Sequence, residues 1–371
     1  MTTRHLALRR SRGLTLIELM VAIALGLVVL TALVALYGNV TRNNNEMTKT
    51  NLLIENGRFA MQLLQDDVAL GGFWGPIDPL DATAVPDPCL AYAKAIDPEQ
   101  PGKWPTANVA ARVEYRDNLL AIPIQAYADG SLLGGCGAGL ANVVAQSDVL
   151  VVRHASTCIA GANCDGGSDT GPHIQVSACR TDAPPEPAYV VESKAELDDR
   201  AAAVPSTKIR LKDCAAGGVG TEAPRRKMLV NLYYVANSAT GVPTLMRVRM
   251  VNGAFGAPEP MVDGIQAFKV ELGVDNKGSN GLPISATNPG DGNADEYVTC
   301  SPGCDLAALA NVVSVKLHVL ARNLEPTAGH TDDKDYQLGP LAIAKANDGY
   351  KRHVFSTTVR VVNPSSRRET P

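Results

Sequence analysis

An uncharged apolar run near the N-terminus constrains this 371-residue chain more than any other feature. No charged side chain occurs in the 18 residues from Leu19 to Leu36, and one carboxylate, Glu18, comes immediately before them. A helix of about 20 apolar residues is long enough to cross the hydrocarbon core of a bilayer. Because a lone acid at the edge of such a helix is costly to bury in lipid, Glu18 is a candidate functional residue.

The segment before the apolar run carries only positive charge, from Arg4, Arg9, Arg10 and Arg12. Cationic flanks stay on the cytoplasmic side, so the rest of the chain is expected to point outward. A secretory signal peptide would place a small-residue cleavage site after the run, but no Ala-x-Ala follows Leu36. A plain signal anchor would leave Glu18 without a role. Both alternatives therefore fit less well than a segment that is processed before the run.

The residues Arg12-Gly-Leu-Thr-Leu-Ile-Glu18 resemble the prepilin signature of type IV pilins. The resemblance implies that a prepilin peptidase cuts between Gly13 and Leu14, removes residues 1–13 as a leader, and that the new N-terminal residue is N-methylated. Glu18 then becomes the fifth residue of the mature chain. The family usually begins its mature chain with Phe, and Leu14 stands in that place here.

The chemistry of the motif agrees with this resemblance. Cleavage creates an amine at Leu14, and Glu18 lies about one helical turn further on. In a fibre of parallel helices, the carboxylate of one subunit can pair with the N-terminal amine of its neighbour. A charge in lipid that gains a partner only on assembly favours extraction into the fibre and fixes the register.

The pattern after the apolar run predicts that the helix continues. Leu52, Phe59, Leu63 and Leu70 recur in steps of seven and four, which places them on one face, and Gly71-Gly72 is a stop signal. We expect one helix over residues 14–72, membrane-bound or fibre-forming in its first half and packed against a sheet in its second. The stretch from Glu55 to Gly75 is also similar to the corresponding segment of the PilW family of minor pilins.

The remainder of the chain has the composition of a loop-rich β head, with 33 Gly, 24 Pro and only 5% aromatic residues. Removing the four leader arginines leaves 30 Lys and Arg against 38 Asp and Glu, a net charge of −8, which gives no support for nucleic-acid binding. Residues 73–226 are expected to be a loop-rich, Cys-containing part. Its expected strands cover residues 118–127, 148–154, 173–176, 188–193 and 207–212.

Residues 227–371 are expected to form the C-terminal sheet. Residues 227–235 and 244–251 are separated by a Gly-containing turn and predict a hairpin. Residues 264–275 and 311–323 alternate apolar and polar side chains, and residues 354–362 are expected to close the sheet. These three strands resemble the C-terminal half of PilW proteins. The expected fold is α+β and pilin-like, a long N-terminal helix packed on antiparallel sheet in a disulfide-containing head.

An even number of cysteines on the exported side of a membrane predicts disulfides. Eight cysteines allow 105 pairings. Pairing of sequence neighbours would join Cys89 to Cys136, Cys158 to Cys164, Cys179 to Cys214, and Cys300 to Cys304. The last pair is favoured because Cys-Ser-Pro-Gly-Cys builds a tight turn. No Cys-x-x-Cys occurs, so no metal site and no cofactor are expected.

No motif of an enzyme active site appears in the sequence, which lacks Gly-x-Ser-x-Gly, His-Glu-x-x-His and P-loop patterns. His318 and His353 fall on expected strands and need no catalytic role. The segment 288–296 carries Asp291, Asp295 and Glu296 and can be compared with calcium loops, but its spacing is not that of an EF-hand. An acidic turn is the simpler expectation, and no enzyme class is supported.

These observations favour a minor pilin that takes part in type IV pilus assembly, in a tip or priming complex. A head of this size would crowd a helical filament, so few copies are expected. The alternatives are a minor pseudopilin of a type II secretion system and a pilus-presented adhesin. The expected partners are other minor and major pilins, the prepilin peptidase and the inner-membrane assembly platform. The protein would cross the inner membrane once, with a periplasmic head, before it joins the fibre at the cell surface.

Overall fold

The computed structural model describes residues 13, 15–77, 80–89, 109–128, 140, 142–160, 171–179, 189–193, 197, 209–212, 221–238, 241–251, 254–301 and 303–369. The chain divides into two compact units, Met1–Asn51 and Leu52–Pro371, which are described separately. The first unit holds the start of helix α1 (Leu16–Leu70), and the second holds its end together with all the strands.

Helix α1 ends where the sequence predicts. It runs for 55 residues to Leu70, and the next two residues form a turn in which Gly72 has a φ of 73°. A positive φ suits glycine because it lacks a Cβ atom. Pro364 also lies close to this glycine, so that a Cβ there would come within 3.1 Å of its ring. The prediction of one long N-terminal helix is confirmed.

The first sheet of the second unit contains eight strands. They are β1 (Ile124–Tyr127), β2 (Val149–Ala155), β3 (Pro172–Val176), β4 (Tyr189–Ser193), β5 (Arg225–Asn237), β6 (Pro243–Val251), β7 (Ala254–Phe255) and β8 (Glu259–Asp263). The main path is β1-β2-β5-β3-β4, and β6 pairs with β5, β7 and β8. The expected hairpin is present, since β5 and β6 pair antiparallel from Asn231↔Arg249 to Asn237↔Pro243.

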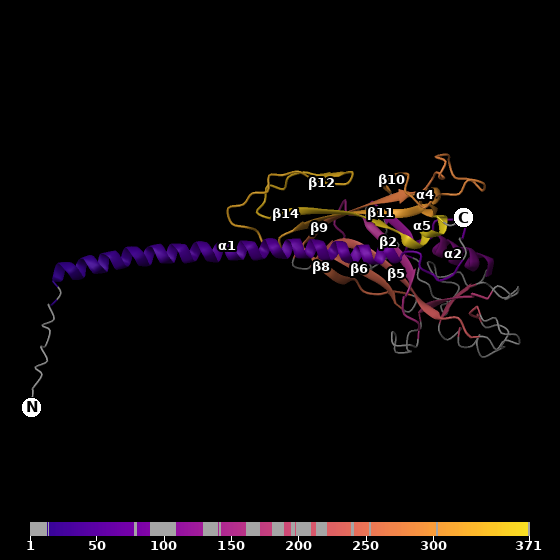
Figure 1. The fold of residues 1–371 in the computed structure, drawn as a ribbon, viewed down its shortest axis with the longest axis horizontal. Helices are drawn as coiled ribbons and strands as arrows, with labels where there is room; N and C mark the ends of the chain where they lie inside the picture. The colour runs from indigo at the N-terminus through magenta and orange to yellow at the C-terminus, as the bar shows by residue number, and fades with distance from the viewer. Residues whose placement is uncertain are drawn as a thin grey trace, which may run out of the picture. The chain divides into compact units, whose positions relative to one another are not determined.

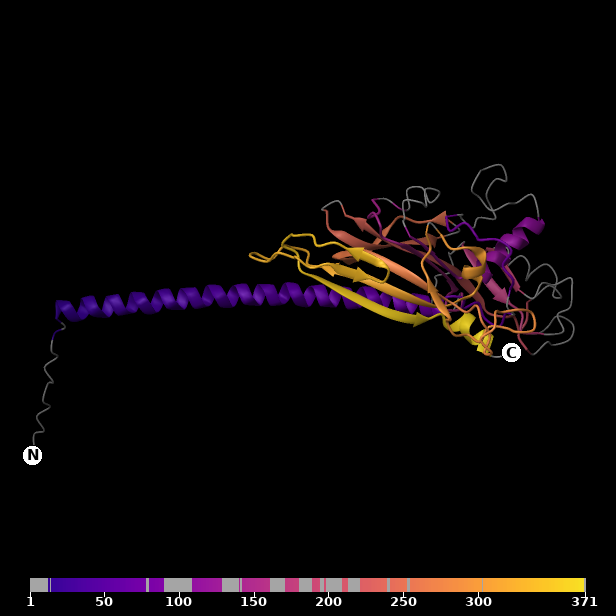
Figure 2. The same ribbon diagram turned by 90° about the horizontal axis from the view of Figure 1, so that it is seen from above.

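The second sheet contains the later strands in the order β10-β9-β11-β14. They are β9 (Ile265–Val274), β10 (Glu296–Val298), β11 (Val312–Arg322) and β14 (Arg352–Arg360). The three long strands confirm the expectation for this region, except that Val362 starts a helix, α5 (Val362–Glu369), instead of ending a strand. A small hairpin joins β12 (Tyr336–Leu338) to β13 (Leu341–Ile343). Figures 1 and 2 show these strands in orange and yellow.

The main core lies where the second half of α1 meets both sheets. Leu64 and Val68 of the helix are fully buried with side chains of both sheets. The sheet residues of this core include Leu150, Val152, Val235 and Leu245 of the first sheet and Phe268, Val270, Leu317 and Val319 of the second. Burial of each large apolar side chain contributes roughly 1.5–3 kcal/mol. In Figure 1 the second sheet lies above this part of α1 and strands β5, β6 and β8 lie below it.

The face of α1 that packs on the sheets is not the one predicted. Leu52 and Phe59 are 41% and 52% exposed, and Leu63 and Leu70 are only half-buried. The buried stripe consists of Leu53, Gly57, Ala60, Met61, Leu64 and Val68. Its small residues let the helix approach closely, since a Cβ at Gly57 would lie 2.1 Å from the ring of Phe355. The prediction chose the face with the larger apolar side chains, whereas the face with the smaller ones packs on the sheets.

A second core covers the opposite face of the first sheet. Helix α2 (Val109–Ala121) lies in this layer, and the Trp74 indole donates a hydrogen bond of 2.9 Å to the Leu120 carbonyl. The expected strand over residues 118–127 is therefore confirmed only for residues 124–127, and helix α2 was not expected. Residues 118–121 end the helix, and the strand begins at Ile124 after Pro123, because the residue before a proline is disfavoured in helical conformation.

One other expected strand is reduced to a single bridge. Of residues 207–212, the structure describes 209–212, and there only Arg210 forms a β-bridge, with Glu222.

A short helix, α4 (Leu306–Ala310), follows the Cys300–Cys304 pair in the sequence. It is capped by the Asp305 carboxylate, which accepts a hydrogen bond from the Ala308 N–H at 2.8 Å. Side-chain caps of this kind satisfy N–H groups that a helix leaves unpaired.

Candidate functional site

The start of α1 is closed by a reciprocal cap between Thr15 and Glu18. The Thr15 N–H and hydroxyl both donate to Glu18 Oε2 at 2.9 Å, and the Glu18 N–H donates to the Thr15 hydroxyl at 3.3 Å. This is a capping box, in which two residues three positions apart satisfy N–H groups at the end of a helix. The sequence signal of a capping box is Thr-x-x-Glu before an apolar run, and residues 15–18 carry it.

The cap leaves one Glu18 oxygen free for a partner. Oε1 accepts no hydrogen bond from the residues that the structure describes, and the Glu18 side chain is exposed. Gly13 is also exposed, and a Cβ at this position would meet nothing within 4 Å. Leu14 and the leader residues 1–12 lie outside the described residues. The geometry therefore presents an accessible glycine and a carboxylate that is held in place on the first helical turn.

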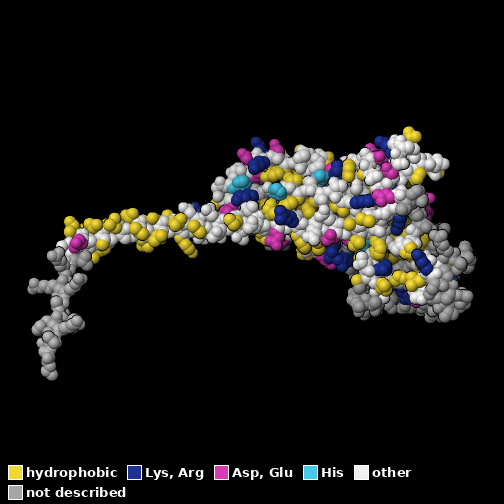
Figure 3. All heavy atoms as spheres, viewed as in Figure 1, with side chains coloured by type: hydrophobic (Ala, Val, Ile, Leu, Met, Phe, Trp, Pro, Cys, Tyr) yellow, Lys and Arg dark blue, Asp and Glu magenta, His cyan; other side chains and the backbone are white. Residues whose placement is uncertain are grey.

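The first half of α1 is apolar on every side. One 18-residue window has a mean hydropathy of 2.9, and none of it is buried within the chain. The exposed large side chains include Leu19, Val28 and Leu36. Figure 3 shows hydrophobic side chains covering this part of the helix on the face in view. A helix with this surface is long and apolar enough to lie in a membrane or against other apolar helices.

A buried polar cluster joins the second half of α1 to the first sheet. His154 Nε2 of β2 lies 2.9 Å from Asp67 Oδ1, and the Asn231 amide of β5 donates to both Asp67 oxygens at 3.1 Å. The side chains of His154 and Asp67 are 4% and 12% exposed. Of the two adjacent acids Asp66 and Asp67, only Asp67 contacts the sheet, and nothing in the sequence marks His154 beyond its place in an apolar strand.

Both ring nitrogens of His154 face acceptors. Nδ1 lies 2.9 Å from the Ala155 carbonyl, so acceptors face both nitrogens, an arrangement that favours the protonated imidazolium. Burial lowers the pKa of His154, but the hydrogen bond and charge of Asp67 outweigh it, and the pKa is raised above its ordinary value. Through these contacts the cluster connects α1 to strands β2 and β5.

His318 lies in a second cluster, across three strands of the second sheet. Its Nδ1 is 2.8 Å from the Ser356 hydroxyl and its Nε2 is 2.8 Å from Glu271 Oε1. The turn of the β12–β13 hairpin closes over the pair, since a Cβ at Gly339 would lie 2.9 Å from Nε2. These contacts connect β11 to its two neighbouring strands, β9 and β14, beneath the β12–β13 turn. His353 stacks edge-on against Phe355, with ring centroids 4.7 Å apart.

The Cys300–Cys304 disulfide is present, with Cα atoms 4.5 Å apart. Cys300 is buried in the main core, so this bond fixes the loop between β10 and α4. Cys89, Cys158 and Cys179 are also disulfide-bonded. The three other expected partners, Cys136, Cys164 and Cys214, lie outside the described residues, and their pairings remain predictions.

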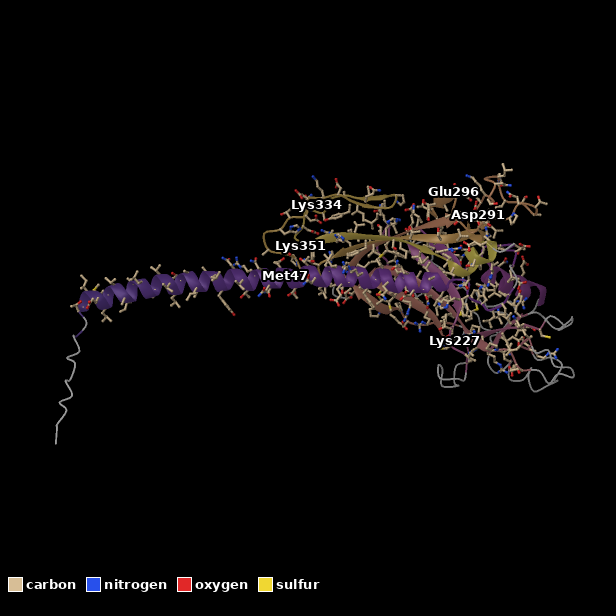
Figure 4. All side chains as sticks on the ribbon, viewed as in Figure 1. Met47, Lys227, Asp291, Glu296, Lys334 and Lys351 are labelled. Atoms are coloured by element: carbon tan, nitrogen blue, oxygen red, sulfur yellow. A yellow bond between two sulfur atoms is a disulfide. The ribbon has the colours of Figure 1, made fainter. Side chains whose placement is uncertain are left out.

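The carboxylates of the acidic turn, which was compared with calcium loops, accept hydrogen bonds from the segment between β9 and β10. Asp291 accepts from the Asn293 N–H at 2.9 Å, and Asp295 accepts from the N–H groups of Asn276 and Lys277. Asn276 also donates to Glu296. Figure 4 labels Asp291 and Glu296 near β10. Within the described part of the chain, no group of three or more His, Cys, Asp or Glu side chains could hold a metal ion.

Comparison with known proteins agrees with both ends of the chain. Residues 232–363 match the family model for type IV pilus-assembly protein W, and residues 8–34 match that of the prokaryotic N-terminal methylation motif. A type IV-like pilin from Thermus thermophilus is similar in structure at 16% identity and a TM-score of 0.24, over 38% of this chain and 70% of that one. No curated protein matches by sequence.

Proposed function

We propose, from the premise that this chain is a PilW-like type IV minor pilin, that it acts in a complex of minor pilins that primes the pilus and remains at its tip. One observation carries the proposal. A match to the N-terminal methylation motif over residues 8–34 and a match to the PilW family over residues 232–363 occur on the same chain. That combination belongs to proteins of pilus assembly, and its role is structural rather than catalytic.

Glu18 is proposed as the residue that fixes subunit register. Thr15 already holds one carboxylate oxygen at the helix start, and the other is free. After cleavage between Gly13 and Leu14, the free oxygen can accept from the N-terminal amine of a neighbouring subunit. A preorganised carboxylate loses little side-chain freedom when it binds, which favours the pairing.

The size of the head supports a minor role. The second unit, Leu52–Pro371, contains two sheets, and the larger one is covered on both faces. A head of this bulk on every subunit would crowd a helical array. We therefore place few copies in the fibre, with the chain first anchored in the inner membrane by α1 and its head in the periplasm.

Deletion of the gene in a piliated host tests the proposal. We expect loss of surface fibres and of twitching, with protein secretion intact, and recovery when the full chain is restored. The Glu18→Gln variant is expected to accumulate in the deletion strain without restoring surface fibres or twitching. Glu55→Gln, at an exposed acid further along the same helix, is the matched control and should restore fibres.

Other outcomes would overturn the proposal. Loss of exoprotein secretion with normal fibres would assign the chain to a type II secretion system. Normal fibres that fail only in surface attachment would make it an adhesin carried by the pilus. Full restoration by Glu18→Gln would remove the assembly role of this carboxylate.

A further inference from the structure

A groove in the second unit runs between α1 and strands β5 and β6. It encloses about 360 Å³. Its walls are Phe59, Gln62, Leu63, Asp66, Asp67 and Leu70 of the helix and Tyr233 and Arg247 of the sheet. Of these residues only Asp67 takes part in the contacts described above, and Phe59 is 52% exposed.

The helix residues in the groove follow the spacing of a helix-packing stripe. Counted from Phe59, they stand at i, i+3, i+4, i+7, i+8 and i+11. This is the spacing of residues on one helix face, and its apolar members are Phe59, Leu63 and Leu70. The helix already buries a different stripe, centred on Ala60 and Leu64, against its own two sheets. Leu63 and Asp67 of the second stripe also contact the head, whereas Phe59, Gln62 and Asp66 remain exposed.

The charges in the groove leave one carboxylate uncompensated. Asp67 is bound by His154 and Asn231, and Arg247 lies 2.6 Å from Glu259. Asp66 is exposed and has no hydrogen bond or ion pair among the described residues. A Lys or Arg side chain could therefore pair with Asp66 while its methylene groups cover Leu63 and its charge approaches the face of Phe59.

We infer that this groove docks an amphipathic helix of another pilin. Two apolar side chains of that helix would contact Phe59 and Leu63, and a Lys or Arg within two turns of them would pair with Asp66. The stripe spans three helical turns, about 17 Å, which suits a helix laid beside α1. The inference rests on the proposed function, because it takes the partner from the same assembly.

Photo-crosslinking in a piliated host tests the docking. A photoreactive phenylalanine analogue replaces Phe59 in the full chain, and the crosslinked peptide is identified by mass spectrometry. We expect a helical peptide of another pilin that carries Lys or Arg within two turns of the attachment point. A second label at exposed Gln62 repeats the test with Phe59 retained.

A charge reversal provides the specificity control. Asp66→Lys should lower the crosslinking yield about tenfold, because it replaces an attraction with a repulsion. Asp333→Lys reverses another exposed acid, between β11 and β12, and should leave the yield unchanged. Equal yields for both variants would overturn the docking, as would crosslinks only to lipid or to proteins that are not pilins.

A label at Val28, on the exposed apolar part of α1, separates the two proposals. If Val28 crosslinks to other pilins and neither Phe59 nor Gln62 does, the docking inference is wrong and the assembly role stands. If no position crosslinks to a pilin and deletion leaves the fibres intact, the assembly role fails as well.

Discussion

Asp67 Oδ1 lies 2.9 Å from His154 Nε2, and this contact pairs an acid of helix α1 with a histidine of the first sheet. The pair is almost shielded from water, and the Asn231 amide satisfies the remaining carboxylate acceptors at 3.1 Å. A buried pair of this kind contributes little by itself, but removing one partner leaves an uncompensated charge. The position of α1 on its sheet therefore depends on both residues together.

Asp67→Asn is expected to destabilise the head by about 2–4 kcal/mol, since it leaves a buried imidazolium without its counter-charge. The neighbouring Asp66→Asn is the matched control. Asp66 is exposed and has no described partner, so its change should stay within about 0.5 kcal/mol. Denaturant unfolding of the full chain in detergent measures both. Equal effects at the two positions would contradict the role of the pair.

The same pair predicts a pH dependence. The pKa of His154 is raised in the folded state, so its charged form stabilises the fold. That contribution is fully present below the unfolded pKa, about 6.5, and is lost as the pH rises through the folded value. The stability gap between the wild type and Asp67→Asn should therefore narrow from pH 6 to pH 9. A gap that stays constant or widens would show that His154 is neutral.

Gly57→Ala is expected to destabilise the head by about 1–3 kcal/mol, although alanine favours helices by about 1 kcal/mol over glycine. The reason is the Phe355 ring, which lies 2.1 Å from the position of the new Cβ. Thermal unfolding of Gly57→Ala, Phe355→Leu and the double variant measures the coupling. The double variant should be less destabilised than the sum of the single changes, and strict additivity would argue against the close approach.

Gly264→Ala combines two penalties at the turn between β8 and β9. Its φ is +80°, and the new Cβ would lie 2.7 Å from the Arg322 carbonyl oxygen. A cost of about 2–3 kcal/mol is expected from strain and backbone displacement. Gly241→Ala shares the positive φ, at +75°, but meets nothing within 4 Å, so it should cost only about 1 kcal/mol. Chemical denaturation of the two variants compares them directly.

The sequence was informative where a pattern is local. Spacing alone located α1 and its end, because a 55-residue helix carries many turns of consistent signal and a double glycine follows it. The alternating strands β9 and β11 were predictable for the same reason. The choice of packing face was not, because small Gly57 and Ala60 form the contact and larger Leu52 and Phe59 do not.

The same difference between local and long-range signals applies to the candidate functional residues. Gly13, Leu14 and Glu18 could be proposed from the sequence because the prepilin motif is contiguous, and their roles stay predictions. The Asp67–His154 pair was not, because 87 residues separate its members and only the paired sheet brings them together. Helix α2 was missed because its segment lacks a clear apolar stripe, and its Asn118 side chain is instead used to bind the N–H groups of Thr83 and Ala84.

The most direct test is the intact mass and N-terminal sequence of the protein from membranes of a piliated host, with and without its prepilin peptidase. We predict a chain that begins at methylated Leu14 only when the peptidase is present, because Gly13 is exposed and the motif is complete. A chain that still carries Met1 to Gly13 in the presence of the peptidase, or one cut after Leu36, would contradict the assembly role.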